Sequence, residues 1–168
     1  TSTAQTISSA IDMSNNVAGY VNSIVSTNTS SDAITIVGDA SAATAMGTAG
    51  IYSWGPSANG GSLGTRILAL GAGGGIKLAG SSNGAFNTLA GASVFGDGVE
   101  LNFTQVLATS GPIVIEGTAT GNNTAGVSFS RRSNTIANDV VAIGSVAGTS
   151  YTPFGGTAIS TASSSSDI

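Results

Sequence analysis

The chain repeats a short pattern in which apolar and polar residues alternate and a turn-forming residue ends the run. Such runs cover residues 34–36, 76–78, 99–103, 113–115 and 127–129, each bounded by Gly, Asn, Asp or Pro. A period of two residues is typical of β-strands, whereas a helix needs a period near 3.6. The sequence therefore predicts an all-β protein, with no long helix from about residue 32 onward.

The runs belong to a longer repeat that has two halves. The first half reads apolar-x-apolar-x-Gly and begins at Ile34, Ile76, Ile113 and, more weakly, Val140. The second half begins with glycine and an apolar or small residue, at Gly50, Gly98, Gly126 and Gly156. One repeat cannot bury its apolar face alone, but stacked repeats share a continuous core. We therefore predict a parallel β-helix, which is a solenoid, built from irregular repeats.

A β-sandwich is the alternative fold, because sandwiches also use short strands at irregular spacing. In that case the protein would be a filament subunit. Its N-terminal arm would complete the sheet of a neighbouring subunit by strand addition.

Three segments are expected along the chain. Residues 1–31 form an N-terminal arm, or a capping or interaction segment, in which Ile7, Ile11 and Val21 fall roughly on one helical face. This arm is helical or extended, because its many Ser, Thr and Asn residues are poor in helix interiors. Residues 32–160 form the β-repeat domain, and residues 161–168 form a Ser-rich tail.

The composition argues against catalysis. The 168 residues include no His and no Cys, and only 4 Lys+Arg and 8 Asp+Glu. Histidine is the usual proton carrier near neutral pH, and cysteine is a strong nucleophile and a soft metal ligand. A net charge of −4 also disfavours nucleic acid as a partner. We expect neither an enzyme nor a bound cofactor.

Asp97 and Glu100 are the candidate metal ligands, since they bracket a short turn and could share a calcium ion. Calcium takes about six to eight oxygen ligands, and few other carboxylates lie nearby in the sequence. Charged side chains solvated at the end of a strand are therefore the default interpretation.

Tyr52 and Trp54 share one face of a predicted strand and are candidate interaction residues. An exposed aromatic pair would anchor a partner, and burial under the next loop is the alternative. Asn28, Asn102 and Asn122 lie in Asn-x-Ser/Thr sequons, whose glycosylation the sequence leaves open.

No run of about 20 apolar residues is present, so no membrane-spanning helix is expected. The opening Thr1-Ser2-Thr3 lacks the basic start and the apolar region of a signal peptide. We expect a processed mature form or a piece of a longer polypeptide.

Residues 111–121, running into residues 125–129, resemble the degenerate repeats of filamentous-haemagglutinin-type exoproteins, and residues 32–40 resemble the same motif. Autotransporter passengers look similar. The resemblance implies a right-handed parallel β-helix that acts as an adhesin or a structural fibre on a bacterial surface, without catalytic residues. The repeats of this chain are longer and less even than those of a compact solenoid.

We therefore expect a non-catalytic, secreted structural or adhesive protein of an extracellular fibre or a cell-surface layer. Its partners would be copies of itself, neighbouring repeats of a longer chain, or glycans of a cell surface. The first alternative is a pilus- or sheath-like filament subunit that assembles by N-terminal strand exchange. A third hypothesis is a β-helical enzyme that acts on polysaccharides.

Overall fold

The computed structural model describes residues 9–15, 17, 20–43, 48–54, 64–84, 96–121, 124–128, 142–145 and 158–161. These residues form strands and turns and no helix, so the all-β prediction is confirmed for them. None of them belongs to a helix long and apolar enough to cross a membrane. The strands are β1 (Ser9–Asp12), β2 (Asn22–Ser26), β3 (Ile34–Ala40), β4 (Ala49–Ser53), β5 (Thr65–Ala69), β6 (Ile76–Ser82), β7 (Val99–Leu101), β8 (Thr104–Ala108), β9 (Ile113–Ala119), β10 (Val127–Ser128), β11 (Ala142–Ser145) and β12 (Ala158–Thr161).

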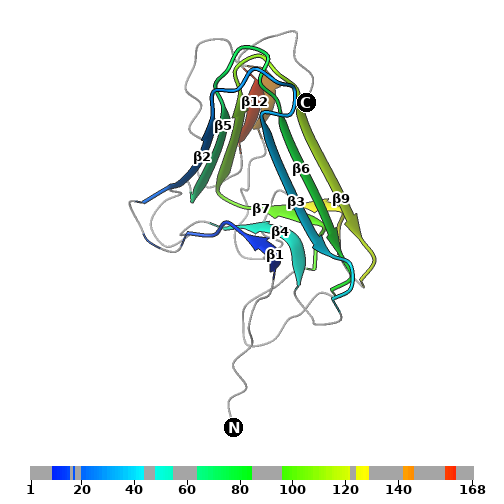
Figure 1. The fold of residues 1–168 in the computed structure, drawn as a ribbon. Coiled ribbons are helices and arrows are strands. Elements are labelled where there is room, and N and C mark those ends of the chain that lie inside the picture. Colours follow the sequence, from blue (N-terminus) through cyan, green and yellow to red (C-terminus); the bar gives the residue numbers. More distant parts are fainter. Residues whose placement is uncertain are drawn as a thin grey trace.

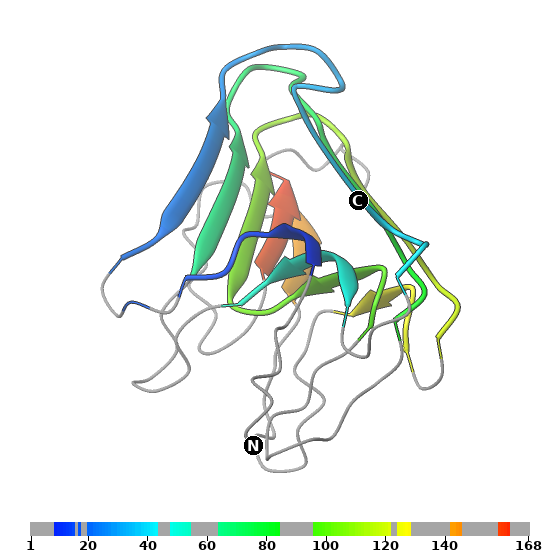
Figure 2. The same ribbon diagram turned by 60° about the horizontal axis from the view of Figure 1, so that its bottom comes forward.

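The strands form three sheets in which every described pairing is parallel. Sheet A has the order β1-β4-β7-β10, sheet B has β2-β5-β8-β12-β11, and sheet C has β3-β6-β9. Up to β9 the chain adds one strand to each sheet in turn, so each set of three strands makes one rung. Figures 1 and 2 show the three sheets around a shared interior, with sheet A at the bottom of Figure 1. The sandwich alternative, with two sheets, does not describe this arrangement.

The two halves of the repeat supply the register of the sheets. In sheet C the first half aligns residue by residue, which places Ile34 beside Ile76 and Ile113, and Gly38 beside Gly80 and Gly117. In sheet A the second half aligns Ile51, Val99 and Val127 in the same way. The repeat that was visible in the sequence is therefore a stacking unit for its first three copies.

The fourth copy of the repeat does not continue the columns that the first three copies form in sheets C and A. Ala142–Ser145, which is β11, pairs with β12 in sheet B and does not join sheet C beside β9. The following segment, β12, pairs with β8 in sheet B, although its second-half pattern predicts a place in sheet A. The prediction of a fourth repeat in sequence order is wrong here, because alternation identifies a strand but does not select which parallel edge it joins.

The core consists of apolar columns that run through the stack, one residue from each rung. The side chains of Ile51, Ile67 and Leu78, in the second rung, have no exposed surface. Their column neighbours Ile11, Ile24 and Ile36, in the first rung, are only partly buried and pack against this core. Because each rung covers the one before it, burial is complete in the middle of the stack and incomplete at its ends.

Two glycine columns allow sheets C and A to approach each other. A Cβ atom on Gly80 would lie 2.0 Å from the carbonyl oxygen of Gly98, and one on Gly38 would lie 2.2 Å from that of Gly50. These distances are far below van der Waals contact, so any side chain would push the two backbones apart. This contact explains why the repeat has glycine both at the end of its first half and at the start of its second half.

Where it is described, at residues 9–15, 17 and 20–31, the N-terminal arm adopts the extended form of the two that were predicted. Its strands β1 and β2 pair with β4 and β5, so strands on both sides of residue 31 share the same sheets. Of the predicted tail, residues 161–168, only Thr161 is described, as the last residue of β12. The division into arm, repeat domain and tail stays a prediction about domains.

Candidate functional site

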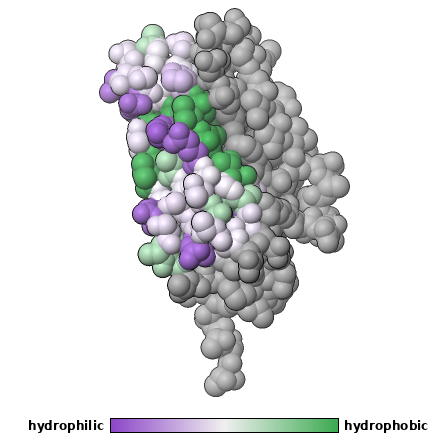
Figure 3. Space-filling view, turned by 90° about the vertical axis from the view of Figure 1, so that its right-hand side faces the viewer, coloured by the Kyte–Doolittle hydropathy of each residue, from purple (hydrophilic) through white to green (hydrophobic). Residues whose placement is uncertain are grey.

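The outward-facing residues of sheet C form the most distinctive described surface. Strand geometry sends alternate residues to opposite faces, so the x positions of the apolar-x-apolar motif face outward. The register arranges them in three cross-strand rows: Thr35, Lys77 and Val114, then Val37, Ala79 and Glu116, then Asp39, Ser81 and Thr118. Figure 3 shows this face, where hydrophobic surface lies next to hydrophilic residues.

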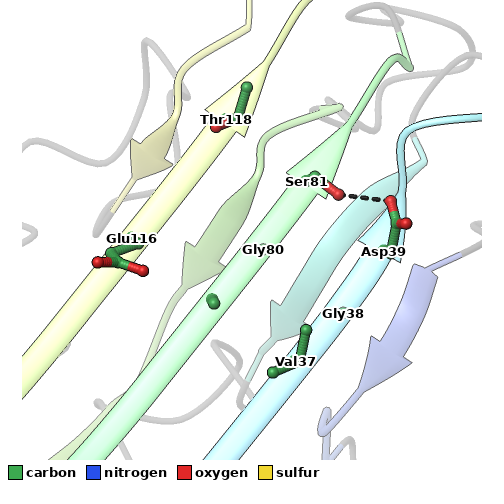
Figure 4. Close-up of a pocket in the computed structure, with 8 residues that line it drawn as sticks. Val37, Gly38, Asp39, Gly80, Ser81, Glu116 and Thr118 are labelled. Atoms are coloured by element: carbon green, nitrogen blue, oxygen red, sulfur yellow. Dashed lines mark hydrogen bonds between the residues drawn. The ribbon is translucent and has the colours of Figure 1, made fainter.

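A shallow hollow of about 300 Å³ lies along the second and third rows. Figure 4 shows the labelled residues that line it, with Val37 and Asp39 on β3 on one side and Glu116 and Thr118 on β9 on the other. Ala79, on the central strand, has a small side chain between Val37 and Glu116, so the surface dips there. The hollow is open, and Val37 beside it is 61% exposed.

Asp39 is the charged group that is most firmly held on this surface. Its Oδ1 accepts hydrogen bonds from the hydroxyl of Ser81, at 2.5 Å, and from the backbone N–H of Ser41, at 2.9 Å. Hydrogen bonds to the carboxylate lower the pKa of Asp39 to about 2. The largest effect comes from the Ser41 side chain, the next from the Ser81 side chain, and the smallest from the Ser41 backbone. Asp39 is therefore an anion at neutral pH and cannot serve there as a proton donor.

Glu116 on β9 forms an ion pair with Lys77 on the neighbouring strand β6. Lys77 Nζ lies 3.1 Å from Glu116 Oε2, and the two side chains are 41% and 59% exposed. An ion pair this open to water contributes less than about 1 kcal/mol. The surface therefore offers hydroxyl groups, an ion pair, one fixed anion and exposed valine, which suits contact with another surface more than acid–base chemistry.

Asp97 and Glu100 are not solvated charges at the end of a strand. Both are buried, with 0% and 2% of their surface exposed. Asp97 Oδ1 accepts the backbone N–H of Ala125 at 2.7 Å, and Glu100 Oε1 accepts from Asn102 Nδ2 at 2.9 Å. Within the described ranges, no group of three His, Cys, Asp or Glu side chains gathers where it could hold a metal ion. The calcium site thus stays an untested prediction, and the solvated interpretation is wrong because these donors come from the folded stack.

The predicted interaction residues lie in different environments. Tyr52 and Trp54 are both partly buried, and their carbonyl oxygens accept the N–H groups of Met13 and Asn15, each at 2.8 Å. Ile11 pairs with Ile51 and packs against the core, whereas Val21 is 37% exposed. Ile7 lies outside the described residues. The four of these residues that are described, Ile11, Val21, Tyr52 and Trp54, therefore do not share one environment.

The sequons also differ in their accessibility. Asn28 is exposed, and its Oδ1 accepts the backbone N–H of Ser30 at 3.0 Å. Asn102 is 3% exposed and is bonded to Glu100, so it cannot be modified in the folded state. Asn122 lies outside the described residues.

Reasoning from the sequence did not single out the sheet C surface as a site. The signal was present in the x positions of the aligned repeats, which are residues 35, 37 and 39 and their equivalents. Reading those positions as columns, rather than reading each strand alone, would have placed Asp39 beside Ser81.

Comparison with protein-family models, with curated proteins and with solved structures gives no match. The resemblance to filamentous-haemagglutinin-type exoproteins therefore stays a prediction that depends on the quoted motifs.

Proposed function

We propose that this chain is a non-catalytic structural or adhesive protein of an extracellular fibre or cell-surface layer, built as a parallel β-helix. The observation that carries the proposal is the in-register stacking of the repeat along one direction in three sheets. Strand ladders along one axis give a rod that lengthens by adding rungs, and its backbone hydrogen bonds lie along the rod.

The interior supports a mechanical role. Columns such as Ile34, Ile76 and Ile113 fill it with apolar side chains, and the middle rung is sealed from water. Buried hydroxyl groups are bonded between rungs, since Thr104 donates to the Ser53 hydroxyl at 2.8 Å. The inward-facing side chains of Ile51, Ile67 and Leu78 are fully buried in one core cluster, so we place the proposed contact on the outer faces.

The outer face of sheet C is the proposed contact surface. Its hollow is shallow and open, and its three cross-strand rows present hydroxyl groups, an ion pair and the exposed Val37, which suits an extended partner such as a surface glycan or a second molecule. An enzymatic role gains no specific support, because Asp97 and Glu100 are engaged in structural hydrogen bonds.

Purified chain examined by sedimentation and by negative-stain microscopy over a range of concentrations tests the proposal. We expect rods or fibres, and a fibre diffraction spacing of about 4.8 Å along their length. A parallel assay would measure retention on immobilised surface polysaccharides. Particles that stay monomeric at every concentration and bind no polysaccharide would contradict the proposal, as would cleavage of a polysaccharide that Asp97→Ala abolishes.

A further inference from the structure

Sheet C stops one rung before its two neighbours. Sheet A continues past the third rung with β10, and sheet B continues with β12 and β11, whereas β9 is the last strand of sheet C. Among the residues that the structure describes, no strand pairs with the outer edge of β9. A strand position beside β9 is thus left without a described occupant, while the two neighbouring sheets extend beyond it.

The outer edge of β9 carries backbone groups suited to a parallel partner. The carbonyl of Pro112 accepts the N–H of Ile76 at 2.9 Å, and the N–H of Thr120 donates to the carbonyl of Ser82 at 3.0 Å. In a parallel ladder alternate residues bond to opposite neighbours, so even-numbered residues of β9 bond to β6. The N–H and C=O groups of Ile115 and Gly117 therefore point toward the unoccupied position.

One of the two inward-facing apolar side chains of β9 is incompletely covered, whereas the other, Ile113, is 1% exposed. Leu78 in the middle strand of sheet C has no exposed surface, whereas Ile115, its column neighbour on β9, is only partly buried. A further strand with an apolar or small residue in that column would complete its burial. Exposed edges with this character are places where proteins add strands.

The chain contains a segment with the matching pattern. The first-half motif recurs as residues 140–145, in which Gly144 corresponds to Gly117 and Ile143 corresponds to Glu116.

In the described arrangement the corresponding strand, β11, holds an edge position in sheet B. Among the described strands it pairs only with β12, through four residue pairs. The order β8-β12-β11 places β12, which comes later in the sequence, between β8 and β11. Consecutive elements of a stack usually follow one another in space, so this order is the exception within the fold. Moving β11 would leave the pairing of β12 with β8 intact.

We propose that the position beside β9 is a strand-acceptor site whose occupant is β11 of the same chain. In the occupied state Gly144 lies beside Gly117 and extends the glycine column, and Ile143 lies beside Glu116 on the outer face. In this state β11 covers the β9 edge, which has no described strand beside it when β11 pairs with β12. This inference concerns strand order within one molecule and is independent of the proposed fibre function.

Disulfide trapping tests the site directly, because the natural chain has no cysteine. Directly paired residues on adjacent strands lie about 4.8 Å apart, within the span of about 4.4–6.8 Å that a disulfide bridges. Glu116→Cys combined with Ile143→Cys is expected to form an intramolecular disulfide. Ile143→Cys combined with Ile159→Cys reports the described β11–β12 pairing. Val114→Cys combined with Ile143→Cys is the register control, since those residues would be about 8 Å apart.

The outcomes separate the alternatives. An intramolecular bond between positions 116 and 143, identified by peptide mapping, together with no bond in the register control, supports the proposal. A bond at 143–159 but none at 116–143 overturns it. A 116–143 bond found only in covalent dimers also overturns it, because the occupant would then be a second copy.

Hydrogen exchange of the unmodified chain gives a second test that needs no substitution. If the site is filled, the amides of Ile115 and Gly117 exchange about as slowly as those of Val114 and Glu116, which already bond to β6. If the edge is open, Ile115 and Gly117 exchange faster by about two orders of magnitude or more, and the proposal fails. The even-numbered amides of the same strand are the internal control.

Discussion

Replacing Gly80 by alanine should destabilise the corner between sheets C and A. The added Cβ atom would lie 2.0 Å from the carbonyl oxygen of Gly98, 2.7 Å from its carbonyl carbon and 2.7 Å from Val99 Cγ2. Two of these three atoms belong to backbone, which cannot rotate away as a side chain can. The shortest contact must lengthen from 2.0 Å to about 3.4 Å, so the two sheets must separate by about 1.4 Å at this rung.

The separation would disturb both glycine columns. Gly80 lies between Gly38 and Gly117 in sheet C, so a shift at the middle rung strains the pairing of β6 with both neighbours. Inserting extra atoms into a packed interior costs about 1–3 kcal/mol. Because the contact is with backbone on the facing strand, we expect a loss near 3 kcal/mol, which lowers the melting temperature by about 6–12 °C.

Urea unfolding followed by far-UV circular dichroism and by the fluorescence of Trp54, the single tryptophan, would measure this loss. Ala79→Ser, on the outer face of the same strand, is the matched control and should change stability by less than about 0.5 kcal/mol. If Gly80→Ala unfolds within about 0.5 kcal/mol of the natural chain with an unchanged spectrum, the close approach of the two sheets is refuted.

Other substitutions test the core and the sheet C surface. Leu78→Ala should cost about 2–5 kcal/mol in urea unfolding, because its side chain is fully buried, and Ile36→Ala at the exposed end of the stack should cost clearly less; equal losses would contradict the end effect. Ser41→Ala should raise the pKa of Asp39 from about 2 toward its ordinary value of 3.8, as measured by carboxyl NMR titration. Because folding lowers the pKa of Asp39, the ionised carboxylate stabilises the fold fully above pH 4, and this stabilisation is lost as the pH falls toward 2. An unchanged pKa of Asp39 in the variant would rule out the Ser41 hydroxyl as the main cause of the lowered pKa. Lys77→Ala should lower the free energy of unfolding by less than about 1 kcal/mol, and high salt should erase the difference; a loss that persists in 1 M salt would show that the ion pair is not its source.

The sequence predicted strands at both halves of the first three repeats, which lie in sheets C and A, but it did not predict the sheet B strands Asn22–Ser26, Thr65–Ala69 and Thr104–Ala108. Alternation identifies a strand from its neighbours along the chain alone, and equivalent apolar residues align because each must face the interior. The glycines were visible as recurring positions, but their role was not. The repeat shows where glycine stands, whereas the contact of Gly80 with Gly98 requires two strands from different sheets.

The candidate surface was less accessible to prediction. Asp39 lies within β3 and receives a hydrogen bond from Ser81, 42 residues away in the sequence, so the register of the sheet supplies its partner. The sequence favoured solvated side chains for Asp97 and Glu100, but both are buried; Asp97 accepts the backbone N–H of Ala125, 28 residues away, and Glu100 accepts from the nearby Asn102. A carboxylate has no local signal for burial, because a hydrogen bond from the protein can replace its contact with water.

Local information was enough to identify the extended runs of the repeat and their inward-facing apolar residues. Only the tertiary structure showed that the strands form three parallel sheets around a shared core, that β11 lies in sheet B, and that β9 is the last described strand of sheet C. The reason is physical: every parallel edge presents the same backbone donors and acceptors at the same spacing. The choice among edges is therefore made by the packing of whole sheets and not by the residues of the strand itself.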